Sequence, residues 1–283
     1  MNVFNLISYD LKNEIINNKR FIVIPFFTIL ECMIAEMNIT SVKKSFSINN
    51  NISFFDLFSS VFKGCDPLSR SLSDWVPIPY LWLSVFIFAM FIVFDYMYND
   101  ISQFGLQIIS RAGRSKWWLS KCISCIITLT SFYTILIFTI IIFSMIRGFS
   151  LLSENSEIIN TIANDSMYLK FKNPEGISVY HIIISLLAPL LVMCATGIIQ
   201  MTMSLFIKPA YSFILMLGVM LSGVFFESTA AYPRCGMILM SDVFFVDGYS
   251  TIKGVFLCIF LMFFFSITGV LCIKKYDILL ARE

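Results

Sequence analysis

Three carboxylates within or beside long apolar stretches are the first residues that could do chemistry: Glu31, Glu36 and Glu227. A charged side chain in hydrocarbon costs on the order of 2.5–3.5 kcal/mol on insertion scales, so it usually faces water, a partner or a ligand. Glu31 lies eleven residues after Arg20, about 16 Å along a helix and near the middle of a bilayer. We interpret these carboxylates as a polar pathway for a cationic molecule. The alternatives are an interhelical hydrogen bond or a deeper helix start for Glu31, and interfacial positions for the other two.

A second group of candidates is basic and lies between two apolar stretches. The segment QIISRAGRSKWWLSK contains Arg111, Arg114, Lys116 and Lys121. Spacings of three and seven residues place Arg111, Arg114 and Lys121 on one face of a helix. Such a face can contact another protein at the membrane surface, or it can fix the topology and bind anionic lipid. The two roles are compatible.

Side chains typical of enzyme active sites are not arranged for catalysis. His181 is the only histidine, and spacing indicates no Ser, Cys or carboxylate partner for catalysis. A GxSxG turn is also absent. Cys122 and Cys125 have CxxC spacing, but in an apolar stretch they are typical of helix packing. We predict no catalytic residue, no metal site and no cofactor on this chain.

Two other cysteines, Cys65 and Cys235, fall in segments that we predict to be external. Disulfides persist in that environment, so a bond between these two cysteines is a hypothesis. A bond would change the thiol count and the gel mobility after reduction.

The elements that position these residues are predicted to be helices in a membrane. Apolar residues make up 58% of the chain and charged residues 13%, about half the charge of a soluble domain. Stretches near twenty apolar residues, the length that crosses a bilayer, recur along the chain. We predict an all-α, polytopic membrane protein with about six crossings, of which the first is the weakest. The predicted crossings are residues 21–39, 80–97, 119–146, 179–207, 211–226 and 255–273.

The segments between the crossings complete a single domain, residues 1–283. Residues 1–20 have a helical apolar stripe and are predicted to lie in the interface. Two long polar loops, residues 41–75 with one amphipathic helix and residues 147–178, are predicted to be external. Residues 100–118 form the basic loop, and residues 237–246 are too short an apolar run to cross, which favours a re-entrant segment.

Orientation follows from Lys and Arg near the ends of the crossings. They concentrate at residues 12–20, 111–121, 208 and 274–282, which predicts that both termini are cytoplasmic in a cell membrane. A net charge of +2 without a polybasic stripe argues against nucleic acid as a partner. The many Phe, Ile and Asn residues favour an AT-biased bacterial genome.

The layout and three segments resemble a known family. The segments are YDLKNEIINNKRFIV, QIISRAGRSKWWLSK and CIKKYDIL. Together with the layout they resemble type-2 ABC transporter permeases, and they are similar to small permeases of bacteriocin or lantibiotic export and immunity systems. The resemblance implies a peptide or amphipathic substrate, a second permease copy or a related one, and ATP-binding-cassette subunits that hold ATP and Mg. It also implies that residues 100–118, with Arg111, Arg114 and Lys116, couple the permease to the ATPase.

An ATPase partner is expected on independent grounds as well, because the phosphate-binding pattern GxxxxGK[ST] is absent from all 283 residues. Two other functions stay open. A secondary transporter has buried ionisable residues too, although it usually has internal repeats. A stand-alone membrane immunity protein needs neither a basic coupling loop nor an ATPase. Co-purification with an ATPase separates the three.

Overall fold

The structure is a computed structural model in which every named element is a helix. It describes residues 3–47, 52–65, 78–97, 109, 111–150, 179–225, 231–246 and 248–275. Within these ranges, extended backbone pairs only at two isolated β-bridges. The predicted all-α class is therefore confirmed for the described part of the chain.

All six predicted crossings contain a helix, but only four of these helices are long and apolar enough to span a bilayer by themselves. The four are α2 (Arg20–Phe46), α7 (Arg114–Ile146), α9 (Val179–Met203) and α11 (Thr251–Lys275). The other two, α4 (Tyr80–Ile92) and α10 (Pro209–Phe225), have 13 and 17 residues. At 1.5 Å per residue α4 is about 20 Å long, shorter than the roughly 30 Å of a hydrocarbon core.

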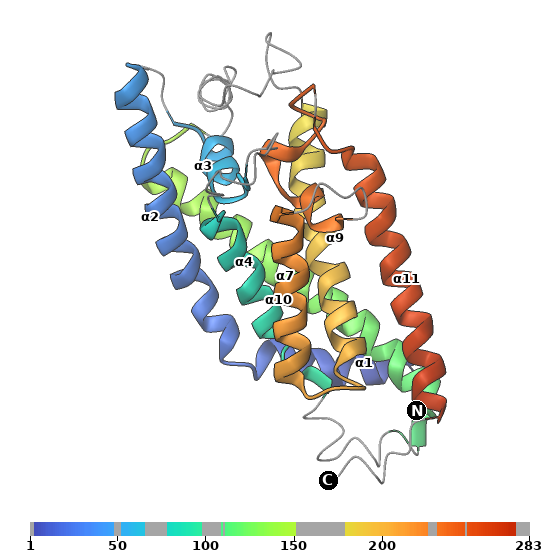
Figure 1. The fold of residues 1–283 in the computed structure, drawn as a ribbon. Coiled ribbons are helices and arrows are strands. Elements are labelled where there is room, and N and C mark those ends of the chain that lie inside the picture. Colours follow the sequence, from blue (N-terminus) through green and yellow to red (C-terminus); the bar gives the residue numbers. More distant parts are fainter. Residues whose placement is uncertain are drawn as a thin grey trace.

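The six helices run alternately up and down (Figure 1). The starts of α2, α7 and α10 and the ends of α4, α9 and α11 lie at one end, which we call the basal end. Helix α7 packs against α2, α9 and α11. Helix α9 is the most buried of the four long helices, whereas α11 is the most exposed. The exposed face of α11 is rich in phenylalanine, as expected of a surface that faces lipid.

Helix α1 (Val3–Leu11) lies across the basal end, and a π-helical turn, η1 (Lys12–Ile16), connects it toward α2 (Figure 1). The predicted N-terminal helix is therefore present. Its Leu6 and Asp10 side chains are buried against the bundle, whereas Phe4 is 83% exposed. The exposed Phe4 belongs to the apolar stripe that predicted an interfacial helix, so the helix packs on the protein through a different face.

At the opposite end of the bundle, the predicted loop over residues 41–75 contains the one helix expected there, but this helix is buried rather than exposed. Helix α2 continues to Phe46, and α3 (Phe54–Val61) is buried along almost its whole length. A capping box between Ser53 and Asp56 fixes its start, with Asp56 Oδ2 accepting from the Ser53 backbone N–H at 2.9 Å. The Phe58 side chain has no exposed surface. The phenylalanine side chains of α3 pack on other parts of the protein. The helix is therefore buried rather than exposed to water.

Residues 231–246 lie beside α3 and contain two short 3₁₀ turns, η2 (Tyr232–Gly236) and η3 (Ile238–Met240). Their backbone is paired with the chain after α3: the N–H groups of Ile238 and Leu239 donate to the carbonyls of Phe62 and Lys63 at 3.0 and 3.1 Å. These bonds satisfy buried polar groups that a regular helix would have paired internally. Irregular backbone is therefore stable here without contact with water.

Helices α7 and α11 touch where a tryptophan meets a glycine. The Trp118 side chain is fully buried, and its Nε1–H donates to the Ser266 carbonyl at 2.9 Å. A Cβ at Gly269 would overlap the Trp118 ring. The small residue permits the close approach, as at many helix contacts in membranes.

We predict that Gly269→Ala lowers the free energy of unfolding by about 1–3 kcal/mol, because the new methyl group forces the Trp118 ring or α11 to move. The matched control is Gly218→Ala in α10, where a Cβ meets no atom within 4 Å. Alanine is the better helix former, so the control should be neutral or slightly stabilising. Unfolding midpoints in detergent measure both. Equal effects of the two substitutions would contradict the proposed contact.

Candidate functional site

Charged side chains from three helices and one turn form two ion pairs at the basal end. We call these four residues, Asp10, Arg20, Asp95 and Lys121, the basal cluster. They come from α1, the start of α2, the turn after α4 and the second turn of α7. The cluster joins segments far apart in the sequence.

The first ion pair fixes α1 beneath α7. Lys121 Nζ donates to Asp10 Oδ1 at 2.8 Å, and the Ser120 hydroxyl donates to Asp10 Oδ2 at 2.9 Å. The Lys121 and Asp10 side chains are only 1% and 5% exposed. Lys121 also lies over the Tyr96 ring, 4.6 Å from its centroid. This corrects the placement of Lys121 on an exposed basic face: it is buried because it neutralises a buried carboxylate.

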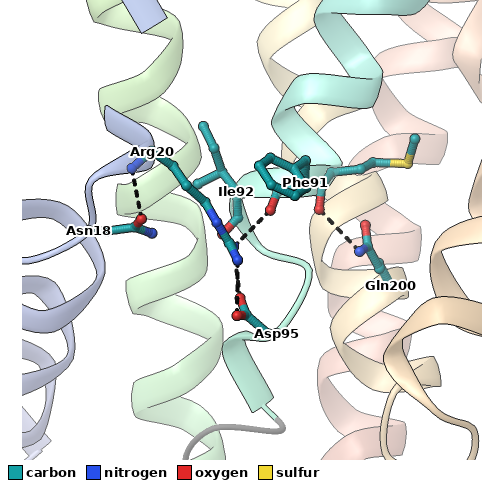
Figure 2. Close-up of polar contacts among 7 residues, drawn as sticks. Asn18, Arg20, Phe91, Ile92, Asp95 and Gln200 are labelled. Atoms are coloured by element: carbon teal, nitrogen blue, oxygen red, sulfur yellow. Dashed lines mark hydrogen bonds and ion pairs between the residues drawn. The ribbon is translucent and has the colours of Figure 1, made fainter. Parts of the chain in front are cut away.

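The second ion pair closes the end of α4 (Figure 2). Arg20 binds Asp95 with both terminal nitrogens, at 2.7 and 3.0 Å. Arg20 Nη1 also donates to the carbonyls of Phe91 and Ile92 at 3.0 and 3.3 Å. The last carbonyls of a helix have no partner within it, and their partial negative charge favours a cation. The Arg20 guanidinium therefore supplies hydrogen bonds to carbonyls that are left without a helical partner where α4 ends.

A glutamine from α9 assists at the same place. Gln200 Nε2 donates to the Met90 carbonyl at 3.1 Å, and the Gln200 side chain is 1% exposed (Figure 2). Together Arg20 and Gln200 satisfy three successive carbonyls at the end of α4. The basal cluster and Gln200 thus tie α1, α2, α4, α7 and α9 together. Their bonds are internal, so we assign them a positioning role.

The predicted coupling residues lie beside the basal cluster. Much of the predicted loop over residues 100–118 lies outside the described residues, but Arg111, Arg114 and Lys116 are described and exposed. Gly113 has a φ of 86°, a left-handed conformation that separates the short helical turn before it from α7. Arg114 Nη1 donates to the Lys274 carbonyl at 2.8 Å, at the end of α11. The basic segment, residues 111–116, therefore continues directly into α7 and is hydrogen-bonded to the end of α11.

Glu31 lies on the inner side of α2 and is 7% exposed. Ser84 Oγ of α4 lies 2.7 Å from Glu31 Oε1 and 2.7 Å from the Leu81 carbonyl. The single hydroxyl proton of Ser84 can serve only one of these two acceptors at a time. Glu31 Oε2 has no hydrogen-bond partner among the described residues. The interhelical contact considered for Glu31 is present, and one oxygen is left for another donor.

The other two predicted pathway carboxylates, Glu36 and Glu227, do not form a site with Glu31 in the described part of the structure. Glu36 pairs with Arg147, whose Nη2 lies 2.9 Å from Glu36 Oε2. This bond links α2 to the end of α7, at the end opposite the basal cluster. Glu227 lies outside the described residues.

The structure does not join Cys65 to Cys235. Cys65 Sγ lies 3.9 Å from the Met237 sulfur, and Cys235 Sγ lies 3.9 Å from Cys258 Sγ. The hypothetical bond is therefore not observed, and each sulfur is buried against a different neighbour. Spacing alone could not indicate which neighbour each thiol meets.

A cavity of about 310 Å³ lies between α2, the end of α3 and the start of α4. Its walls combine apolar and polar side chains, and they include Asn38, Ile39, Lys63, Tyr80 and Trp82. Asn38 donates to the Tyr80 hydroxyl at 2.9 Å. Asn38 is seven residues beyond Glu31, about 10 Å along α2. The cavity and Glu31 therefore both lie at the contact between α2 and α4.

Sequence reasoning missed the basal cluster as a unit. Lys121 is the informative residue, because it falls inside the predicted crossing 119–146, where a charge needs a partner. An unpaired charge in such a place predicts a partner, but the sequence does not say which one. Lys121 and Asp10 are separated by 111 residues.

No protein-family model matches the chain. No curated protein matches it significantly in sequence. The fold and the apolar helices by themselves define the class: the chain is an α-helical membrane protein, and its described residues include four helices long and apolar enough to cross a bilayer.

Proposed function

We propose that the chain is the membrane-spanning permease subunit of an ABC transporter, driven by ATP that a partner subunit hydrolyses. The observation that supports it best is the attachment of the exposed basic segment to the bundle. Arg114 bonds the end of α11, and Trp118, one turn later, bonds the Ser266 carbonyl inside the same helix. A displacement of the basic segment by a partner would therefore move α7 and α11 together.

The positive segment also offers a suitable surface for a partner. Arg111, Arg114 and Lys116 are exposed at the basal end, where an acidic groove of an ATPase could receive them. The buried bond between Asp10 and Lys121 holds α1 at the same end. A movement of the basic segment would therefore be transmitted to several helices, because α1 is held rigidly against α7.

The topology that we propose has six crossings, with the basal end and both termini in the cytoplasm of a bacterial cell. Helix α4 would complete its crossing through residues 93–97, and α10 would be followed by the re-entrant segment 237–246. The positive-inside rule supports this orientation, because Lys208 and Lys274 also lie at the basal end.

The substrate that we propose is a peptide or amphipathic compound with a cationic group. The cavity walls suit such a molecule, because Ile39 and Trp82 offer apolar contacts and Tyr80 and Asn38 offer hydrogen bonds. Glu31 supplies a negative charge along the same helix pair, and its buried Oε2 has no hydrogen-bond partner among the described residues. Export or self-immunity against such a compound fits these features.

The first experiment is purification of the tagged chain from its native membrane in mild detergent, with mass spectrometry of bound proteins and an ATPase assay. We expect a stoichiometric subunit with a P-loop. The double substitution Arg111→Glu and Arg114→Glu should abolish ATPase stimulation, because both charges of the contact are reversed. The conservative variant with Lys at both positions is the matched control. If the wild-type chain is folded but binds no ATPase, the proposal is wrong.

We predict that Glu31→Gln reduces transport of a cationic substrate about tenfold or more while leaving the stability of the fold unchanged. The amide can donate to Ser84 Oγ, so the contact between α2 and α4 survives and only the charge is lost. Uptake or export rates and unfolding midpoints measure the two effects. The control substrate is a neutral analogue, whose transport should not change. Unchanged transport of the cationic substrate, at normal membrane levels, would remove Glu31 from the pathway.

A further inference from the structure

The segment 231–246 touches α11 through a pair of thiols. Cys235 of η2 and Cys258 of α11 are 3% and 0% exposed, and their sulfurs are 3.9 Å apart. Sulfurs at this distance are in van der Waals contact, and a bond needs them to approach to about 2.05 Å.

The backbone around the pair brings the two cysteines together. A Cβ at Gly254 would strike the Cys235 side chain, so η2 can approach α11 closely only because residue 254 is glycine. Cys258 lies four residues after Gly254, one turn along the same face of α11. The Cys235 thiol also donates to the Tyr232 carbonyl at 3.1 Å, which restricts its orientation. The contact is therefore defined by several groups.

We propose that Cys235 and Cys258 form a redox-sensitive dithiol, which a low-molecular-weight disulfide converts into an internal disulfide that fixes segment 231–246 to α11. One protein thiolate attacks the external disulfide, forms a mixed disulfide and releases one small thiol. The second protein thiolate then displaces the other small thiol. Both protein S–H bonds and the external S–S bond are broken, and the two electrons pass to the external reagent.

The bond would have a mechanical consequence. The η2 turn also packs against α9 and α10, so the disulfide would hold three helices and the irregular segment in one arrangement. The neighbouring Cys258 thiol and burial raise the pKa of Cys235, so few thiolates are present at neutral pH and the exchange is slow. The inference does not depend on the proposed transport function.

The test is a thiol count on the full-length chain in native membranes, treated with a pyridyl disulfide and then unfolded and alkylated. We expect the eight thiols of the untreated chain to fall by two, with a peptide cross-linked between Cys235 and Cys258 in the mass spectrum. Cys235→Ser and Cys258→Ser cannot form the internal bond, so the remaining cysteine can stop only as a mixed disulfide, and each variant should lose at most one of its seven thiols and show no cross-linked peptide. The matched control Cys65→Ser should still lose two.

Three results would overturn the proposal. The first is a wild-type chain that keeps all its thiols. The second is a chain that stops at a mixed disulfide on one cysteine. The third is a link to another cysteine, such as Cys194, which also lies near Cys258. Reversal by a reducing agent separates the disulfide from irreversible oxidation. Because the wild-type chain alone gives the decisive count, a serine variant that fails to fold does not weaken the test.

Discussion

Replacing Lys121 by methionine is expected to lower the free energy of unfolding by about 3–5 kcal/mol. The ammonium group is 2.8 Å from Asp10 Oδ1, and both side chains are almost fully buried. Methionine preserves most of the volume but removes the charge that compensates for Asp10. The cost arises because a buried carboxylate then loses its cation, and α1 should separate from the bundle. Unfolding midpoints in detergent and hydrogen exchange of the α1 amides measure both effects.

Two variants test the cause of that loss. Lys116→Met changes an exposed lysine of the same helix and should have an effect within about 0.5 kcal/mol. The double variant Asp10→Asn with Lys121→Met removes both charges together and should recover much of the stability, because no uncompensated charge is left. If the double variant is as unstable as the single one, the ion pair is not the cause.

Replacing Trp82 by alanine is expected to cost about 3–5 kcal/mol as well. The Trp82 side chain is fully buried, packs 4.8 Å from the Phe86 ring centroid and donates from Nε1 to the Gly236 carbonyl at 3.0 Å. The truncation leaves a cavity and an unpaired carbonyl in segment 231–246. That segment should loosen, so Cys235 should react faster with a maleimide.

The Trp82 prediction has two controls. Trp82→Phe keeps an aromatic ring and loses only the indole hydrogen bond and some volume, so it should cost about 1–3 kcal/mol. Phe263→Ala removes a ring that is 65% exposed on α11, and it should change stability by less than 1 kcal/mol. Equal losses for Trp82→Ala and Phe263→Ala would show that the buried contact with Gly236 is not important.

The sequence indicated the helices correctly because each depends on a local property. A run of apolar residues has few alternatives to a helix in lipid, since each buried backbone group must be paired within its own segment. All six predicted crossings contain a helix for this reason, and the N-terminal helix follows from its apolar stripe. Glu31 was identified by the same logic, since a carboxylate that deep needs a partner.

The errors came from contacts between segments far apart in the chain. Residues 52–65 were predicted to belong to an exposed loop with one amphipathic helix, yet segment 231–246 and α7 cover that helix, α3. Lys121 was placed on a basic surface, yet Asp10 attracts it into the interior. The predicted pairing of Cys65 and Cys235 gave way to the contact with Cys258. None of these partners has a fixed sequence spacing.

The sequence by itself therefore determined that the protein lies in lipid, where its helices are, and which charged residues need a partner. Hydropathy and the cost of burying a charge are properties of single residues, so they can be read without the fold. Only the tertiary structure decided which partners these residues found. It paired Asp10 with Lys121, placed Arg20 at the end of α4, and brought Cys235 to Cys258. The physical reason is that such pairings depend on the packing of whole helices, and packing is set by the shapes of many side chains together.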